Sequence, residues 1–253
     1  MKLAGRHAVV TGGGSGIGAA IARALTADGA AVTLIGRRRD ALEQVAATLP
    51  SAAIAPADIT SRTEIDAAFA TARAAHGPIS ILVNNAGAAP SAPFAKVTAE
   101  GWRSAMAINL DALFDCCQSA LPDLLAAEAG RIVTIASTAG LKGYAYTAPY
   151  VASKHGAIGL MRALAVELAK TGVTANAVCP GFTETDIVAD AIANIRAKTG
   201  RSEDDARAEL AKFNPQKRLI APEEVASAVV WLCLPENRSI TGQAIAVAGG
   251  EVM

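Results

Sequence analysis

The stretch Ala8-Val9-Val10-Thr11-Gly12-Gly13-Gly14-Ser15-Gly16-Ile17-Gly18 joins a short apolar run to a segment with helical periodicity. Apolar residues recur every four positions at Ile17, Ile21 and Leu25, which predicts a helix that continues to Asp28. Glycines let a backbone turn tightly and approach a pyrophosphate, and the N-terminus of a helix offers free N–H groups to it. Because a strand precedes the glycines and a helix follows them, the stretch predicts a dinucleotide-binding turn. A glycine-rich helix cap without a ligand is the alternative.

The second apolar run, residues 31–35, ends at Gly36 and is followed by Arg37 and Arg38. A site specific for NAD(H) usually carries an acid at this strand end, where it binds the ribose 2′-hydroxyl. Here glycine holds that place, and a guanidinium suits a 2′-phosphate. The pattern therefore predicts that NADP(H) is preferred, mainly through Arg37, with NAD(H) still possible. A solvated basic helix start is the alternative.

The alternation of apolar runs and helical segments continues through the rest of the chain. We predict further strands at residues 52–57, 79–83, 131–136, 173–178 and 243–247, and helices at 62–75, 99–127, 149–171 and 222–234. A charged segment, residues 183–213, interrupts this rhythm and predicts a helix-turn-helix insertion that serves as a lid over the substrate. The pattern predicts an α/β fold: a single domain, residues 1–253, with a Rossmann-type doubly wound parallel sheet of about seven strands and helices on both faces.

Composition excludes several classes of protein. With 52% hydrophobic and 18% charged residues the 253-residue chain can bury a large core, and its formal net charge of zero favours neither a nucleic acid nor a membrane surface as a partner. No apolar run reaches the ~18 residues of a membrane span, and the N-terminus lacks a secretory signal. The four cysteines have no CxxC spacing and are predicted to be buried or free thiols, which indicates a cytoplasmic protein. The three scattered histidines predict no metal site.

Tyr150 and Lys154 lie one helical turn apart, so that their side chains leave the same face of the predicted helix. A nearby ammonium favours the phenolate and lowers the pKa of a tyrosine, which makes it a better proton donor. Ser137 follows the apolar run 131–136 and is therefore expected at the carboxyl end of a strand, where open α/β sheets bind ligands. An ordinary helix face with a solvated lysine is the alternative.

Taken together, the chain resembles the short-chain dehydrogenases/reductases over essentially its whole length. The matching motifs are Thr11-Gly12-x-x-x-Gly16-x-Gly18, Asp58, Asn84-Asn85-Ala86-Gly87, Asn109, Ser137, Tyr150-x-x-x-Lys154 and Pro180-Gly181 with Thr183. Within the family, residues 135–140 and 177–182 are most similar to those of 3-oxoacyl-thioester reductases and aromatic polyketide ketoreductases. The sequence departs from the family at Ala248-Gly249-Gly250, where Asp-Gly-Gly is common.

The resemblance implies a catalytic role for four residues. Tyr150 would donate a proton to the carbonyl oxygen as hydride arrives, and Lys154 would lower the pKa of that tyrosine and bind the nicotinamide ribose. Ser137 would hold the substrate oxygen. Asn109 would support a water-linked proton relay through Lys154, although a purely structural role for this residue in mid-helix is the alternative.

The resemblance also implies the residues of the two binding sites. The cofactor-binding residues would be Thr11, Gly12, Gly14, Ser15, Gly16, Ile17, Gly18, Arg37, Arg38, Asp58, Ile59, Asn85, Ala86, Gly87, Tyr150, Lys154, Pro180, Gly181 and Thr183. The substrate would contact Ser137, Tyr144 and Tyr150. Tyr146 offers a second aromatic surface, but both loop tyrosines are equally expected to pack against the lid or another subunit. The basic residues of the lid favour a solvated surface over a phosphate site; they are Arg196, Lys198, Arg201, Arg207 and Lys212.

For function, a 3-oxoacyl thioester or related β-keto compound ranks first as substrate, and a small secondary alcohol or cyclic ketone second. A non-catalytic dinucleotide-binding sensor is a remote alternative, since fold alone does not dictate function. The intact set of Ser137, Tyr150 and Lys154 argues against it. An epimerase or dehydratase of the extended relatives would carry an added C-terminal substrate domain, which is not expected here. The family also implies a homotetramer with interfaces on the helices at 99–127 and 149–171.

Overall fold

The computed structural model describes all residues from 1 to 253 and contains one sheet of seven parallel strands. The order across the sheet is β3-β2-β1-β4-β5-β6-β7. The strands are β1 (His7–Thr11), β2 (Ala31–Gly36), β3 (Ala52–Pro56), β4 (Ile81–Asn84), β5 (Arg131–Ile135), β6 (Thr174–Pro180) and β7 (Ala244–Val247). The predicted doubly wound parallel sheet is therefore confirmed, with strand ends shifted by a residue or two.

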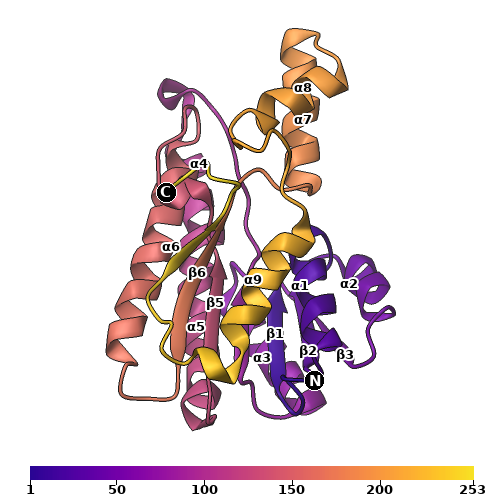
Figure 1. The fold of residues 1–253 in the computed structure, drawn as a ribbon, viewed down its shortest axis with the longest axis vertical. Helices are drawn as coiled ribbons and strands as arrows, with labels where there is room; N and C mark the ends of the chain where they lie inside the picture. The colour runs from indigo at the N-terminus through magenta and orange to yellow at the C-terminus, as the bar shows by residue number, and fades with distance from the viewer.

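Helices cover both faces of the sheet, because successive residues of a strand point to opposite faces and both sets are apolar. Val9 packs into the core beneath α3 (Arg62–His76), α5 (Ala112–Ala126) and α6 (Ala148–Glu167). Its neighbours Ala8 and Val10 pack into the core beneath α1 (Gly16–Ala27), α2 (Arg39–Ala46) and α9 (Pro222–Cys233). In Figure 1, α1 and α9 lie side by side over that second face. All four cysteines are buried and free, as predicted.

The sheet has its topological switch point between β1 and β4. The chain builds outward from β1 to β3, then returns to the other side of β1 to form β4 and continues outward again. Because all strands are parallel, the residues after β1, β4, β5 and β6 meet at one edge. This is where open α/β sheets bind their ligands, so the fold brings together the loops that carry the predicted site.

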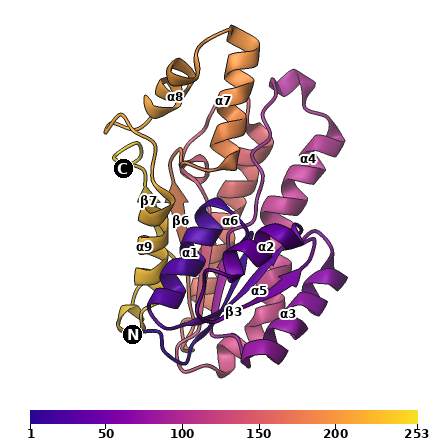
Figure 2. The same ribbon diagram turned by 90° about the vertical axis from the view of Figure 1, so that its right-hand side faces the viewer.

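The segment 183–213 contains α7 (Asp186–Thr199) and α8 (Glu203–Ala211), which project beyond the carboxyl edge of the sheet in Figures 1 and 2. The two helices share a small core of their own; its members are Val188, Ile192, Ala206, Leu210, Ala211 and Leu219. We call this pair of helices the lid. It is joined to the body at Thr183, which forms an isolated parallel bridge with Ile220 on the returning chain.

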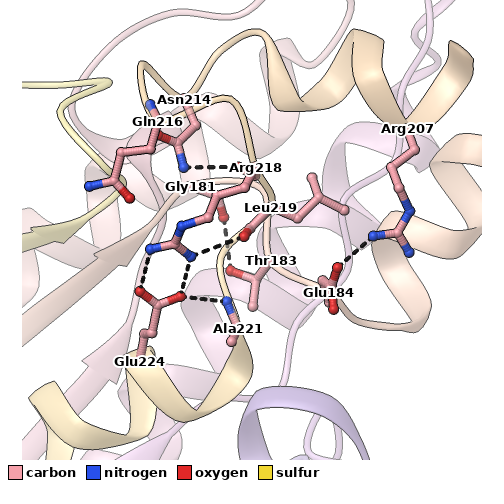
Figure 3. Close-up of polar contacts among 10 residues, drawn as sticks. All are labelled: Gly181, Thr183, Glu184, Arg207, Asn214, Gln216, Arg218, Leu219, Ala221 and Glu224. Carbon is pink, nitrogen blue, oxygen red and sulfur yellow. Dashed lines mark hydrogen bonds and ion pairs between the residues drawn. The ribbon is translucent and has the colours of Figure 1, made fainter. Parts of the chain in front are cut away.

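The return from the lid is pinned by an ion pair at the start of α9. Two nitrogens of Arg218 donate to Glu224 at 2.6 and 2.7 Å, and the Ala221 amide donates to the same carboxylate at 2.8 Å (Figure 3). The Arg218 hydrogen bond and the Ala221 amide lower the pKa of Glu224 to about 2. This carboxylate stays ionised at neutral pH and holds the exit of the lid against the first turn of α9.

Most basic side chains of the lid are paired with acids. Arg196 pairs with Glu203 at 3.0 Å, and both Arg201 and Lys212 pair with Glu209. Arg207 pairs with Glu184 (Figure 3). These exposed pairs leave little unpaired positive charge for a phosphate, which agrees with the solvated surface that the sequence favours. No helix of the structure combines the length and the apolar character needed to span a membrane.

Candidate active site

The glycine-rich turn after β1 is tied to the loop after β4 by hydrogen bonds within the protein. Thr11 Oγ1 accepts from the amides of Asn85 at 3.0 Å and Ala86 at 3.1 Å, and Asn85 Nδ2 donates to the carbonyls of Thr11 and Gly12. A Cβ on Gly18 would lie 2.2 Å from the Gly12 carbonyl oxygen, so this approach requires glycine. Thr11 and Asn85, both predicted to bind cofactor, therefore use their side chains to hold the site together.

The first turn of α1 remains available to an anion. It contains no acidic residue, and its leading amides, which include those of Ile17 and Gly18, have no partner one turn earlier in the helix. Gly16 has φ of +51° and approaches Thr185 of the lid. Gly14 and Ser15 complete the turn, so the structure brings the predicted pyrophosphate-binding residues to the N-terminus of a twelve-residue helix.

The two arginines after β2 have different surroundings. Arg38 Nη2 donates to Ser15 Oγ at 3.3 Å and lies 3.6 Å from Asp186 of the lid. Arg37 is exposed on the side of Asp58, where its charge helps to lower the pKa of that carboxyl; the larger cause is two hydrogen bonds from Thr60. Ile59 follows and is buried. Arg38 is thus the arginine that contacts the glycine-rich turn, whereas the sequence favours Arg37 as the main determinant.

Ser137 and Tyr150 converge at the carboxyl end of β5. Ser137 caps a short 3₁₀ turn by accepting from the Ala139 amide at 3.1 Å, which fixes its side chain. Tyr150 stands in the first turn of α6, preceded by Pro149, which suits a helix start. Burial raises the pKa of the Tyr150 phenol, and the neighbouring Ser137 hydroxyl lowers it in part. The two hydroxyls are therefore placed to share one substrate oxygen.

Lys154 is buried one turn after Tyr150, and its Nζ donates to the Ile135 carbonyl at 2.9 Å. The ammonium lies 5.6 Å from the centre of the Tyr150 ring. Burial lowers the pKa of Lys154 to about 8, while Cys179 nearby raises it slightly. The net pKa of Tyr150 is therefore raised and not lowered as the sequence predicts, because burial outweighs the other influences on the phenol and the Lys154 ammonium donates to the end of β5.

The predicted helix at 99–127 is interrupted at Asn109. Helix α4 (Ala99–Met106) passes into α5 through a π-helical turn, Ala107–Asp111. Within it, Asn109 Nδ2 donates to the carbonyls of Ala88 and Ala105 at 2.9 Å each, and its Oδ1 accepts from the Ala88 amide at 3.1 Å. The side chain therefore fastens the loop after β4. A π-helical turn of this kind is often found at a functional site.

A small internal cavity connects Asn109 with Lys154. It offers room of about 10 Å³, roughly what one water needs, and Thr11, Thr134 and Ile135 also line it. Gly87 lies against it, since a Cβ there would be 2.7 Å from Asn109 Oδ1 and 3.6 Å from Lys154 Nζ. The geometry is compatible with the expected water-linked relay, although the Asn109 side chain itself is fully engaged with backbone.

The loop after β6 forms the opposite wall. Pro180 ends the strand, and Thr183 Oγ1 donates to the Gly181 carbonyl at 3.0 Å, as Figure 3 shows. Thr183 is buried, so this turn is rigid where the chain leaves for the lid. The predicted residues Pro180, Gly181 and Thr183 thus lie together beside Ser137, because β6 pairs with β5.

The two loop tyrosines have different surroundings. Tyr144 packs edge-on against Phe182 and Phe213, with ring centres 6.3 and 5.8 Å away, and this aromatic cluster joins the catalytic loop to both ends of the lid. Tyr146 has φ of +67° and is 66% exposed. Of the two loop tyrosines, only Tyr144 lies between the loop after β5 and the lid, where we expect a wall of the substrate site.

One residue of this wall, Glu251, was not predicted from the sequence. Glu251, near the C-terminus, accepts from the Tyr144 hydroxyl and from Lys142 Nζ at 3.1 Å. Glu251 is the only acid after Glu236, which is the one signal in the sequence that sets it apart. Nothing in the local pattern shows that the tail folds back on the site.

Known proteins are similar to this chain over almost its whole length. The model of the short chain dehydrogenase family matches residues 6–196. A Streptomyces coelicolor protein named as a candidate ketoacyl reductase is 38% identical, covering 96% of this chain and 95% of its own length. A D-beta-hydroxybutyrate dehydrogenase of Rhizobium meliloti is 36% identical over 97% of this chain and 98% of its own. The crystal structure of a variant actinorhodin polyketide ketoreductase with NADPH matches with a TM-score of 0.92 at 36% identity, covering 97% of each chain.

The low pKa of Lys154 has a consequence for stability. Between pH 8 and 10.5 the unfolded chain binds more protons than the folded one, so stability attributable to this residue rises with pH. We expect the unfolding free energy of the wild type, relative to Lys154→Met, to increase by about 2–3 kcal/mol between pH 7 and pH 10. Urea titrations across that range measure it, with exposed Lys170→Met as the control. A difference that stays flat with pH would contradict this assignment.

Proposed function

The chain belongs to the short-chain dehydrogenase family and is an oxidoreductase, and from this premise we propose that it interconverts a ketone and a secondary alcohol with NADP(H), using Tyr150 as the general acid and base. The observation that carries the proposal is the convergence of Ser137, Tyr150 and Lys154 at the edge of the sheet where α1 begins. Ketoacyl reductases and hydroxybutyrate dehydrogenases among the relatives act on this class of bond.

The residues present fit a nicotinamide dinucleotide. The acid-free first turn of α1 suits its pyrophosphate, and Arg38 at the glycine-rich turn, with Arg37 on the other side, suits a 2′-phosphate. Gly36 occupies the strand end where a carboxylate would repel that phosphate. Support also comes from the similar ketoreductase structure, which contains NADPH. A bound NADP(H) supplies or accepts the hydride.

The chain's own residues would handle the oxygen and its proton. Ser137 Oγ, fixed by the Ala139 amide, holds the substrate oxygen, and the Tyr150 phenol gives it a proton in reduction or removes one in oxidation. The Tyr150 phenol carries its proton at neutral pH, and because burial raises its pKa, release of that proton would need a nearby positive charge to stabilise the phenolate. Lys154, charged below about pH 8, would favour the phenolate once the proton has left, and the cavity at Asn109 gives room for a water that returns it.

A 3-oxoacyl thioester or related β-keto compound remains the first-ranked substrate, in keeping with the ketoacyl reductases among the relatives. A small secondary alcohol or cyclic ketone ranks second. It is favoured by the aromatic cluster of Tyr144, Phe182 and Phe213 and by the pairing of the lid's basic residues, which leaves little charge for a carrier phosphate. A relative from Sinomonas cyclohexanicum, 38% identical, is named as a cis-4-hydroxycyclohexanecarboxylate dehydrogenase. We place the reaction in the cytoplasm, as the cysteine usage suggests.

We further propose a homotetramer built on α5 and α6. Phe114 and Leu125 on α5 are 47% and 46% exposed, and Val166 on α6 is 80% exposed. Large apolar side chains on two long neighbouring helices are typical of surfaces that another subunit covers.

Replacing Tyr150 by phenylalanine removes the proton donor and leaves the ring. With acetoacetyl-CoA, a free β-keto ester and a cyclic ketone followed at 340 nm, we expect kcat to fall by about 10²–10⁴. NADPH affinity, measured by fluorescence, should stay near that of the wild type. Ser137→Ala should lower mainly kcat, by about 10²–10³. Turnover retained in Tyr150→Phe would remove this residue as the acid.

NADPH should give a higher kcat/KM than NADH. Arg37→Ala and Arg38→Ala should each raise the KM for NADPH by about 10- to 100-fold, since a hydrogen bond to a charged group contributes about 1.5–3 kcal/mol. Both variants should leave the KM for NADH nearly unchanged. The control is Arg39→Ala, which removes an exposed arginine paired with Glu43 within α2. A wild type that prefers NADH would show the cofactor assignment to be wrong.

The assembly is tested by light scattering at micromolar concentration. The wild type should have four times the 25.6 kDa chain mass, and Phe114→Asp together with Val166→Asp should reduce it. Ile187→Asp, at a 48% exposed apolar residue of the lid, is the matched control and should leave the mass unchanged. A monomeric wild type would exclude the tetramer.

A further inference from the structure

The last residues of the chain form an ordered part of the substrate side. The tail turns at Gly249 and Gly250, whose φ values are +60° and +92°, and Gly249 packs so closely on Asn214 that a Cβ would lie 2.0 Å from its Oδ1. Asn214 is itself held, because its Nδ2 donates to the Arg218 carbonyl and its Oδ1 accepts from the Gln216 amide (Figure 3). The return loop of the lid thus supports the turn that carries the next residue, Glu251.

The side chain of Glu251 is only 1% exposed, and its two oxygens have different surroundings. Oε1 accepts from the Tyr144 hydroxyl and from Lys142 Nζ at 3.1 Å. Oε2 is buried, and no donor of the protein lies within hydrogen-bonding distance of it. Buried carboxylate oxygens nearly always accept a hydrogen bond, because leaving one without a donor costs about 1–3 kcal/mol or more. The geometry therefore leaves one acceptor position to be filled.

This free oxygen borders the reaction site. It lies 2.9 Å from the position that a Cβ on Gly181 would take, at the end of β6. On the other side, the Tyr144 hydroxyl that binds Glu251 also accepts from Thr138 Oγ1 at 2.7 Å, and Thr138 follows Ser137 directly. Oε2 thus lies between the strand end beside Ser137 and the wall formed by Tyr144.

The charge of the carboxylate is already compensated by Lys142, whose ammonium also lies 5.0 Å from the centre of the Tyr144 ring. Oε2 therefore lacks a hydrogen-bond donor and does not require a second cation. We propose that Glu251 determines substrate specificity: its Oε2 accepts a hydrogen bond from a hydroxyl group carried by the substrate near the reacting carbonyl. This inference rests on the proposed ketone reduction and narrows its substrates to hydroxyketones.

Three matched ketones test it: ethyl 3-oxobutanoate, its 4-hydroxy derivative and its 4-methoxy derivative, each assayed with NADPH. The methoxy group matches the hydroxyl in position and polarity but cannot donate. In the wild type we expect kcat/KM for the hydroxy ester to exceed that for the methoxy ester by on the order of 10²–10⁴, since sites built to bind a hydroxyl reject analogues that lack it.

Glu251→Gln should remove the preference for a substrate hydroxyl over a methoxy group. Lys142 and Tyr144 both donate toward the first oxygen, so the amide oxygen stays there and its NH₂ takes the place of Oε2. A hydroxyl can accept from that NH₂, and so can a methoxy oxygen. The ratio of the two kcat/KM values should therefore fall to within about tenfold of unity. Glu236→Gln, at an exposed acid beyond the end of α9, is the control and should keep the wild-type ratio.

The outcomes separate this inference from the proposed function. Equal turnover of the hydroxy and methoxy esters by the wild type overturns the role of Glu251, whether or not the variant folds. A ratio preserved in Glu251→Gln overturns it as well. Weakened NADPH binding in that variant with an unchanged ratio assigns Oε2 to the cofactor and also overturns it. Failure of the wild type to reduce any of the three esters, the parent included, counts against the proposed function itself.

Discussion

The tie between the turn after β1 and the loop after β4 is the interaction on which the site depends. Thr11 and Asn85 join the two halves of the sheet at its switch point, and Gly12 and Gly18 allow the backbones to approach closely enough for the bonds to form. Once the two loops are joined, the first turn of α1 and the Asn109-bound loop lie at the same edge of the sheet. The polar side chains of the motif thus stabilise this edge, and the backbone amides of α1 remain for the ligand.

Burial governs the chemistry of the proton site. Burial raises the pKa of Tyr150 and lowers that of Lys154 to about 8, so each group favours its neutral form more than it would in water. A phenol that keeps its proton is a donor, and an ammonium that readily loses its proton is able to pass one on. The Ser137 hydroxyl partly offsets the effect on Tyr150, which places the polar help at the oxygen where the proton is used.

Sequence patterns predicted the features that follow from the order of the elements along the chain and from where each strand ends. The apolar runs and the glycine-rich turn give the sheet, and a parallel sheet necessarily brings Ser137 and the loop at Gly181 to one edge. The π-helical turn at Asn109 could not be predicted, because the same residues suit an α-helix and only the contact with Ala88 distinguishes the two. The raised pKa of Tyr150 was missed for a related reason: the Tyr-x-x-x-Lys spacing shows the neighbour but not the burial.

The wall at Tyr144 is held in place by different contacts from those that position Ser137, Tyr150 and Lys154. Ser137 follows β5 directly, and Tyr150 and Lys154 stand on α6, so their positions follow from the sheet and the helix packed on it. Tyr144, in contrast, is positioned by Phe213 at the end of the lid and by Glu251 in the tail. The contact with Glu251 joins residues 107 apart in the sequence, and neither contact involves a motif residue. A change in the lid or tail can therefore alter the wall at Tyr144 while Tyr150 and the glycine-rich turn keep their geometry, which is why the motif residues alone do not identify a substrate.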